Sequence, residues 1–188
     1  LVYRGNPKAS TGLLLAEVAY YRNEVDNLIR FVQNSQRVSQ PHNIGRAQLS
    51  GVETRAQARP LTWLELGGNY TYQRAENRSP FSYERGKDLP NAPRHSLDGR
   101  LSLLLACLSL RYELNYESRH FLDRANLRPV PARATHSLGV DLGLSHGVTL
   151  SFEGNNLTDS QVADLWGYPL PGRAFFLSLK QDLNALLK

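Results

Sequence analysis

The segment CLSLRYELNYES, residues 107–118, decides how this chain folds. From Leu108 to Tyr116 every second residue is leucine or tyrosine, and the residues between them are serine, arginine, glutamate and asparagine. Successive side chains of an extended chain point to opposite faces. The alternation therefore predicts a β-strand with one apolar and one polar face.

The same alternation recurs along the chain. It is clear in LTWLELGGNYTYQRA (61–75), RATHSLGVDLGLS (133–145) and GVTLSFEGNN (147–156). Extended to the whole sequence, it predicts an all-β, antiparallel fold of about eight strands, each about ten residues or more, the length that a tilted membrane strand needs. The predicted spans are 12–33, 42–58, 61–75, 94–105, 107–119, 133–144, 147–157 and 172–182.

The connections between these strands alternate in length. Short turns are predicted at 59–60, 106 and 145–146, and long polar loops at 76–93, 120–132 and 158–171. Short turns on one side and long loops on the other are typical of an outer-membrane β-barrel. Tyrosines near the long-loop ends fit an aromatic girdle at the lipid headgroups: they are Tyr20, Tyr21, Tyr70, Tyr72, Tyr112 and Tyr116.

One segment departs from strict alternation. In NIGRAQLSGVETRAQA (43–58) the apolar parity changes between Leu49 and Val52. One extra residue in a strand produces such a change, so the sequence predicts a β-bulge at Ser50 and Gly51.

Composition excludes several other classes. The chain has 188 residues, and its longest nearly apolar run, LSLLLACLSL (101–110), is far shorter than the roughly 20 residues of a transmembrane helix. The net charge is +5, but the basic residues are scattered singly, which disfavours nucleic-acid binding. Cys107 is the one cysteine, so there is no intrachain disulfide.

The segment GYPLPGRAFFLSLK (167–180) predicts a loop that runs directly into a strand. Its prolines and glycines exclude a helix, and Phe175, Leu177 and Leu179 then share one face. A strand so near the end of the chain raises the question of which strand it pairs with.

Six segments follow one another along the chain in a characteristic order: YYRNEVDNLIRF, NIGRAQLSGVE, LELGGNYTYQRA, LPNAPRHS, EGNNLTD and GYPLPGRAFFLSLK. This ordered series resembles the C-terminal third of a TonB-dependent outer-membrane receptor. The resemblance implies an up-and-down transmembrane β-barrel of about 22 strands around a plug domain. Residues 1–188 would then form the C-terminal portion of the barrel, and the plug and the earlier strands would precede Leu1.

The resemblance also implies a function, which is energy-coupled uptake of a scarce nutrient across the bacterial outer membrane. A ferric siderophore is the favoured cargo, with cobalamin or haem as alternatives. The implied partners are outer-membrane lipid and lipopolysaccharide, the plug domain of the same polypeptide, the inner-membrane TonB complex and the small-molecule ligand. No cofactor, no resident metal and no catalytic residue are expected.

Two other architectures remain open at this stage. A self-contained eight-stranded barrel, structural or phospholipase-like, would require the strand near Leu13 to pair with the strand near Leu177. A soluble lipocalin-like binder would require the apolar face to point inward. The polar faces of the predicted strands are too charged for a dry ligand cavity but suit a wet lumen; they carry Glu65, Arg111, Glu113, Asp141 and Glu153. For catalysis, His95 and Ser96 are adjacent in a predicted strand, so their side chains point to opposite faces.

Candidate functional residues fall into two groups. Cationic and aromatic loop residues suit anionic or catecholate iron chelates, although a basic loop facing lipopolysaccharide is an equal alternative; the predicted ligand-binding residues are Arg78, Phe81, Tyr83, Arg85, Lys87, Arg119, Arg124 and Arg128. The residues predicted by parity to face the lumen are Glu53, Arg55, Glu65, Asn69, Gln73, Arg111, Glu113, Asp141 and Glu153.

Overall fold

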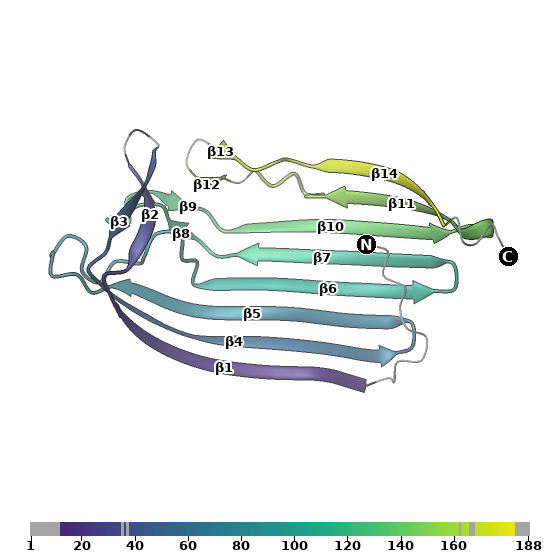
Figure 1. Cartoon of the computed structure of the whole chain (residues 1–188), viewed down its shortest axis with the longest axis horizontal. Helices are drawn as coiled ribbons and strands as arrows, with labels where there is room; N and C mark the ends of the chain where they lie inside the picture. Colours follow the sequence, from purple (N-terminus) through teal and green to yellow (C-terminus); the bar gives the residue numbers. More distant parts are fainter. Residues whose placement is uncertain (1–11, 35, 37, 162, 166–167, 183–188) are drawn as a thin grey trace.

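The computed structural model describes residues 12–34, 36, 38–161, 163–165 and 168–182. Within them, eight long strands form one antiparallel sheet in which each strand pairs with the next long strand along the chain (Figure 1). This is an up-and-down meander, and it confirms the predicted all-β antiparallel fold. The strands of this sheet are β1 (Gly12–Asp26), β4 (Arg46–Leu61), β5 (Leu64–Asn77), β6 (His95–Leu105), β7 (Leu108–Glu117), β10 (Arg133–Gly143), β11 (Val148–Asn155) and β14 (Ala174–Gln181).

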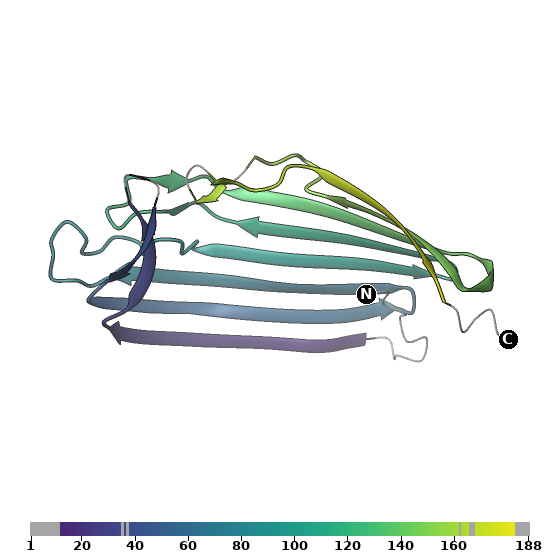
Figure 2. The same cartoon turned by 45° about the horizontal axis from the view of Figure 1, so that its top comes forward.

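The remaining elements lie in the long connections. They form three two-stranded sheets: β2 (Ile29–Gln33) with β3 (Ser39–Asn43), β8 (His120–Phe121) with β9 (Pro129–Val130), and β12 (Ala163–Leu165) with β13 (Tyr168–Pro169). All three lie at one end of the large sheet, and the short turns lie at the other end (Figures 1 and 2). A 3₁₀ turn at Ser145–Gly147 joins β10 to β11. No helix among these residues is long and apolar enough to cross a membrane.

The strand register places apolar residues beside apolar residues, and polar residues beside polar residues, on neighbouring strands. Leu101 of β6 pairs with Tyr112 of β7, which pairs with Leu138 of β10. One position along β6, Ser102 pairs with Arg111. The large sheet therefore has one apolar and one polar face. The apolar face is open in this structure, where 75% of Val18 and 73% of Leu177 are exposed.

The predicted strand 12–33 is wrong in its second half. β1 ends at Asp26, and Asn27 adopts a left-handed conformation with φ 56°. Asparagine tolerates this conformation better than most residues, so the chain can turn there. β2 then folds back onto β3, and the next long strand begins at Arg46, not at residue 42. Residues 27–45 are therefore a further long connection that the alternation did not reveal.

The predicted bulge at Ser50 and Gly51 is also wrong. β4 pairs without a shift from Ala47 to Gln57 against both of its neighbours. Leu49 lies on the polar face because it packs there against a cluster of buried loop residues that includes Leu89. The change of parity thus reflects what covers Leu49 and not an extra residue.

Gly51 has a different role, which is to make room for Tyr21 of β1. A Cβ at position 51 would lie 2.7 Å from the Tyr21 hydroxyl oxygen and closer still to the carbonyl oxygen of Tyr72. Because one obstacle is backbone, a side chain at this position forces a shift of the sheet.

Replacing this glycine should destabilise the large sheet. We expect Gly51→Ala to cost about 1–3 kcal/mol, as overpacking usually does, and to lower the temperature at which the folded band disappears in heat-modifiability gels. Gly67→Ala is the matched control, because its Cβ would have no neighbour nearer than 3.9 Å. Equal melting of the two variants would contradict this account of Gly51.

Candidate functional site

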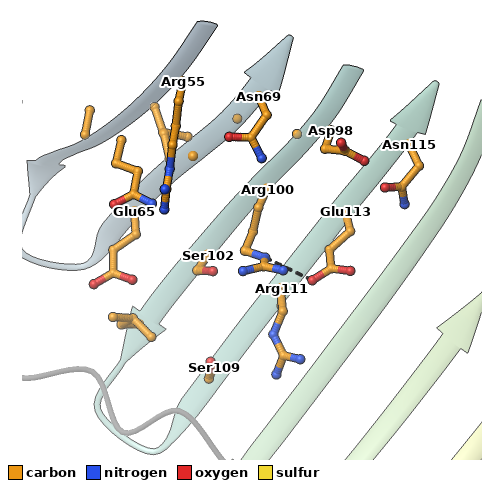
Figure 3. Close-up of a pocket in the computed structure, with 17 residues that line it drawn as sticks. Arg55, Glu65, Asn69, Asp98, Arg100, Ser102, Ser109, Arg111, Glu113 and Asn115 are labelled. Atoms are coloured by element: carbon orange, nitrogen blue, oxygen red, sulfur yellow. Dashed lines mark hydrogen bonds and ion pairs between the residues drawn. The ribbon is translucent and has the colours of Figure 1, made fainter. Parts of the chain in front are cut away.

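The polar face of the large sheet carries a hollow of about 720 Å³. Five residues predicted to face the lumen line it, namely Arg55, Glu65, Asn69, Arg111 and Glu113 (Figure 3). The strand register places the other four, Glu53, Gln73, Asp141 and Glu153, on the same face: Glu53 pairs with Thr71, Gln73 with Gly51, Asp141 with Ser109 and Glu153 with Gly139.

Ion pairs connect neighbouring strands across this polar face. Arg100 Nε lies 3.0 Å from Glu113 Oε1, and Arg111 Nη2 lies 3.3 Å from Asp141 Oδ2. These groups are partly exposed, so each pair contributes little stability and remains available to water or to a polar partner. The polar face can therefore pack against another polar protein surface or line a water-filled lumen.

Sequence reasoning missed the contribution of β6 to this face. Asp98, Arg100 and Ser102 line the hollow, as do Ser109 and Asn115 of β7. The alternation in SLDGRLS (96–102) would have identified the residues of β6, because its polar residues share one parity.

The strand register also sets out a polar row across the sheet. Arg55, Asn69, Asp98 and Asn115 occupy paired positions on four successive strands. Directly paired residues have Cβ atoms about 5 Å apart, so the row presents alternating charged and amide groups at one height in the sheet.

On the apolar face, two histidines pair with tyrosines. His95 Nδ1 lies 2.8 Å from the Tyr70 hydroxyl, and His136 Nδ1 lies 2.6 Å from the Tyr112 hydroxyl. Ser96, which follows His95, lies on the opposite face in register with Thr71. The described residues contain no group of three or more metal-ligating side chains.

The loop between β5 and β6 carries an exposed aromatic and cationic tip. The rings of Phe81 and Tyr83 lie 6.0 Å apart, centroid to centroid, and the two residues are 59% and 60% exposed. Arg85 and Lys87 follow in the same turn and are exposed. Within the part of the chain that the structure describes, neither cation has an ion-pair partner. We call Phe81, Tyr83, Arg85 and Lys87 the loop tip.

The other four predicted ligand-binding residues have partners within the protein. Arg78 lies 2.8 Å from Glu76, and Arg124 lies 2.8 Å from Glu84. Arg128 donates to the carbonyl oxygen of Asn34 at 2.8 Å, and the guanidinium of Arg119 lies 5.0 Å from the centre of the Phe121 ring. These four arginines therefore differ from Arg85 and Lys87, which are exposed and have no ion-pair partner among the described residues.

A small apolar core lies beneath these loops. It consists of five buried residues from the loops and the adjoining strand ends, against which Leu28 and Leu49 pack; the five are Ile44, Ala47, Ala75, Leu89 and Ala92. We call this cluster the loop core. Sequence reasoning missed it because its members are isolated within polar segments and show no periodicity. Below the tip, Arg94 donates a hydrogen bond to Asp88 at 3.0 Å, and this bond raises the pKa of the Arg94 guanidinium.

These features define a class of protein. A meander of long strands with an exposed apolar face, a polar face and long connections at one end is the wall of an outer-membrane β-barrel. Residues 4–157 match the model of the TonB dependent receptor-like β-barrel family, and the chain belongs to that family.

Solved structures of outer-membrane receptors share this fold. The siderophore receptor PiuA of Acinetobacter baumannii superposes with a TM-score of 0.72 at 20% identity over 87% of this chain. The ferric yersiniabactin uptake receptor FyuA of Yersinia pestis gives 0.69 at 19% over 88%. A mutant of the ferric enterobactin receptor PfeA of Pseudomonas aeruginosa gives 0.65 at 22% over 91%. The chain covers 25%, 25% and 29% of these proteins, respectively.

Receptors of this family are transporters of the bacterial outer membrane and not enzymes. The apolar face of the sheet therefore faces lipid, and the polar face, with its hollow, faces the lumen. In such barrels the long connections lie on the extracellular side, which places the loop tip outside the cell.

The two faces should differ sharply in their tolerance of charge. We expect Leu114→Arg, on the lipid face of β7, to destabilise the barrel by about 2–4 kcal/mol if the site lies near the bilayer midplane. Asn115→Arg, the next residue, should be tolerated, because it lies on the lumen face in register with Asp98. The measurement is the folded fraction recovered in outer-membrane preparations. A stronger defect in Asn115→Arg would reverse the assignment of the faces.

Proposed function

We propose that this chain is the C-terminal portion of the barrel of a receptor that takes up a ferric siderophore across the outer membrane. The observation that carries this proposal is the loop tip, where two exposed rings and two exposed cations share one extracellular turn. Ferric siderophores are bulky chelates, many of them anionic and many with aromatic catecholate rings. Arg85 and Lys87 would neutralise the charge, while Phe81 and Tyr83 would pack on the rings.

The free edges of the sheet support a larger barrel. Among the described strands, β1 pairs only with β4, and β14 pairs only with β11. Unpaired backbone groups cost several kcal/mol each in hydrocarbon, so both edges need partner strands in the membrane. A self-contained eight-stranded barrel would pair β1 with β14, and the structure shows no such pairing between them. We therefore infer that further strands of the same polypeptide close the barrel.

The remaining parts of the proposal follow from this assembly. A plug domain within the closed barrel would contact the charged lumen face, and the inner-membrane TonB complex would supply energy through it. Lipid and lipopolysaccharide would surround the apolar face and its tyrosines. Three of the similar structures are receptors for a siderophore, ferric yersiniabactin and ferric enterobactin, which agrees with a ferric chelate as cargo here.

Removing the two cations of the loop tip should weaken binding of anionic chelates. A hydrogen bond to a charged group contributes about 1.5–3 kcal/mol, so Arg85→Ala with Lys87→Ala should lower the affinity of the intact receptor by about tenfold or more. Retention of radiolabelled ferric catecholate and ferric hydroxamate chelates on whole cells measures this.

Arg22→Ala is the control for loss of a cation away from the loop tip, because Arg22 is exposed and lies 3.5 Å from Glu24 in β1. It should bind the chelates as the unaltered receptor does. Unchanged affinity of the double variant for every chelate would remove the loop tip from the site. Growth on these chelates without the receptor would exclude the siderophore and leave cobalamin and haem to be tested as cargo.

A further inference from the structure

The loop that carries the tip is joined to the next long loop by an ion pair whose carboxylate is buried. Glu84, which lies between Tyr83 and Arg85 of the loop tip, exposes only 1% of its surface. Its Oε1 lies 2.8 Å from Arg124 Nη1, in the loop between β7 and β10. Its Oε2 accepts a hydrogen bond of 3.3 Å from Asn77 Nδ2, and Asn77 is also buried. A buried carboxylate is unfavourable without such partners, so Glu84 depends on Arg124.

A second set of bonds joins the same two loops. Asn126 accepts a hydrogen bond from the amide of Asp88 at 2.8 Å and donates one to the carbonyl oxygen of Asp88 at 2.9 Å. The amide of Asn91 donates to the carbonyl oxygen of Phe121 at 2.8 Å. The backbone below the tip is thereby held to the neighbouring loop at two further points.

The long connection between β1 and β4, which contains β2 and β3, contacts both loops. Arg128 donates to the carbonyl oxygen of Asn34 at 2.8 Å, and Arg30 donates to that of Asn91 at 3.4 Å. These contacts involve segments far apart in sequence, and they gather at the long-loop end of the sheet (Figure 1).

We propose that residues 77–94 and 118–132 are one conformational unit, latched by the Glu84–Arg124 pair, and that the latch sets the position of the loop tip. In relation to ligand, this rests on the proposed function. Glu84 and Arg124 are positioning residues, because they act through the backbone of the turn and not by touching the ligand. Arg124 thus has a different role from the ligand contact expected from sequence.

The physical reason for coupling is the cost of a lone buried charge. If Arg124 is removed, the buried Glu84 carboxylate loses its ion-pair partner, and it can regain solvation only when the turn at 81–87 moves into water. If Glu84 is removed, the guanidinium of Arg124 loses its buried partner, and the loop at 123–128 is released. Each substitution should therefore loosen both loops and not only its own.

Hydrogen exchange on the intact receptor in detergent micelles, without ligand, tests the latch. The amides of residues 85–87 and 89 and those of residues 125–128 all donate hydrogen bonds, either within their own loop or to the end of β5, so their protection can be measured. We expect Glu84→Gln and Arg124→Gln each to speed exchange tenfold or more in both groups. Amides of the long strands should not change.

Three further variants make the test specific. Arg119→Gln, which removes a partly stacked cation from the same loop as Arg124, should leave exchange at residues 85–89 unchanged. The double variant Glu84→Gln with Arg124→Gln should exchange no faster than the faster single variant, because both substitutions break one interaction. Arg124→Lys keeps the positive charge and should raise the exchange rate less than Arg124→Gln does. If Glu84→Gln does not assemble, the comparison of these two Arg124 variants tests the latch instead. Faster exchange confined to the substituted loop, or full additivity in the double variant, would overturn the latch.

Arg85→Gln separates the latch from the binding site. It should weaken chelate binding and leave exchange in both loops unchanged. If it binds chelate normally while Glu84→Gln still loosens both loops, the latch stands and the ligand site is wrong. If it weakens binding while Glu84→Gln loosens only its own loop, the ligand site stands and the latch is wrong.

Discussion

The structure depends on one constraint, which is that backbone N–H and C=O groups in hydrocarbon must find their partners within the sheet. β4 shows the consequence, because it pairs without interruption against both neighbours from Ala47 to Gln57. Its register shifts lie near the short-turn end, between Leu13 and Leu15 of β1 and between Ala58 and Leu61 of β4. Irregular backbone is thus confined to the margin of the sheet, where water can reach it.

The two faces of this single sheet meet different environments. On one side leucine, tyrosine and phenylalanine are exposed to lipid, and on the other arginine, glutamate and asparagine face an aqueous lumen. The cross-strand ion pairs of the lumen face are partly exposed, so they keep their charges solvated. On the lipid face each histidine shares a hydrogen bond with a tyrosine, which reduces the cost of a polar ring at that position.

The sequence predicted the eight long strands and the two faces of the sheet. Side chains along a strand point alternately to its two sides, so alternating polarity indicates which side each residue faces. It failed where a residue's partner comes from far along the chain. Leu49 breaks the pattern because the loop core covers it. Residues 27–45 form a hairpin because Asn27 turns the chain in a left-handed conformation. The apolar residues after Asn27 continue the strand pattern, so the turn is not visible in the sequence. The partners of Arg124 and Arg128 could not be predicted either, because these partners, Glu84 and Asn34, lie in other loops. Alternation carries no information about such contacts.

The separation between the loop core and the loop tip bears on how receptors of this kind diverge. The loop core, with buried Leu89 and Ile44, holds the extracellular segments in place, and the rings of Phe81 and Tyr83 take no part in it. Exposed substitutions away from such packing usually change stability by less than about 0.5 kcal/mol. Mutation can therefore alter the exposed side chains of the outer turn while buried Glu84 and the scaffold beneath are retained. A lineage can in this way acquire a new nutrient, or escape a toxin that recognises the old surface, without first gaining stability elsewhere.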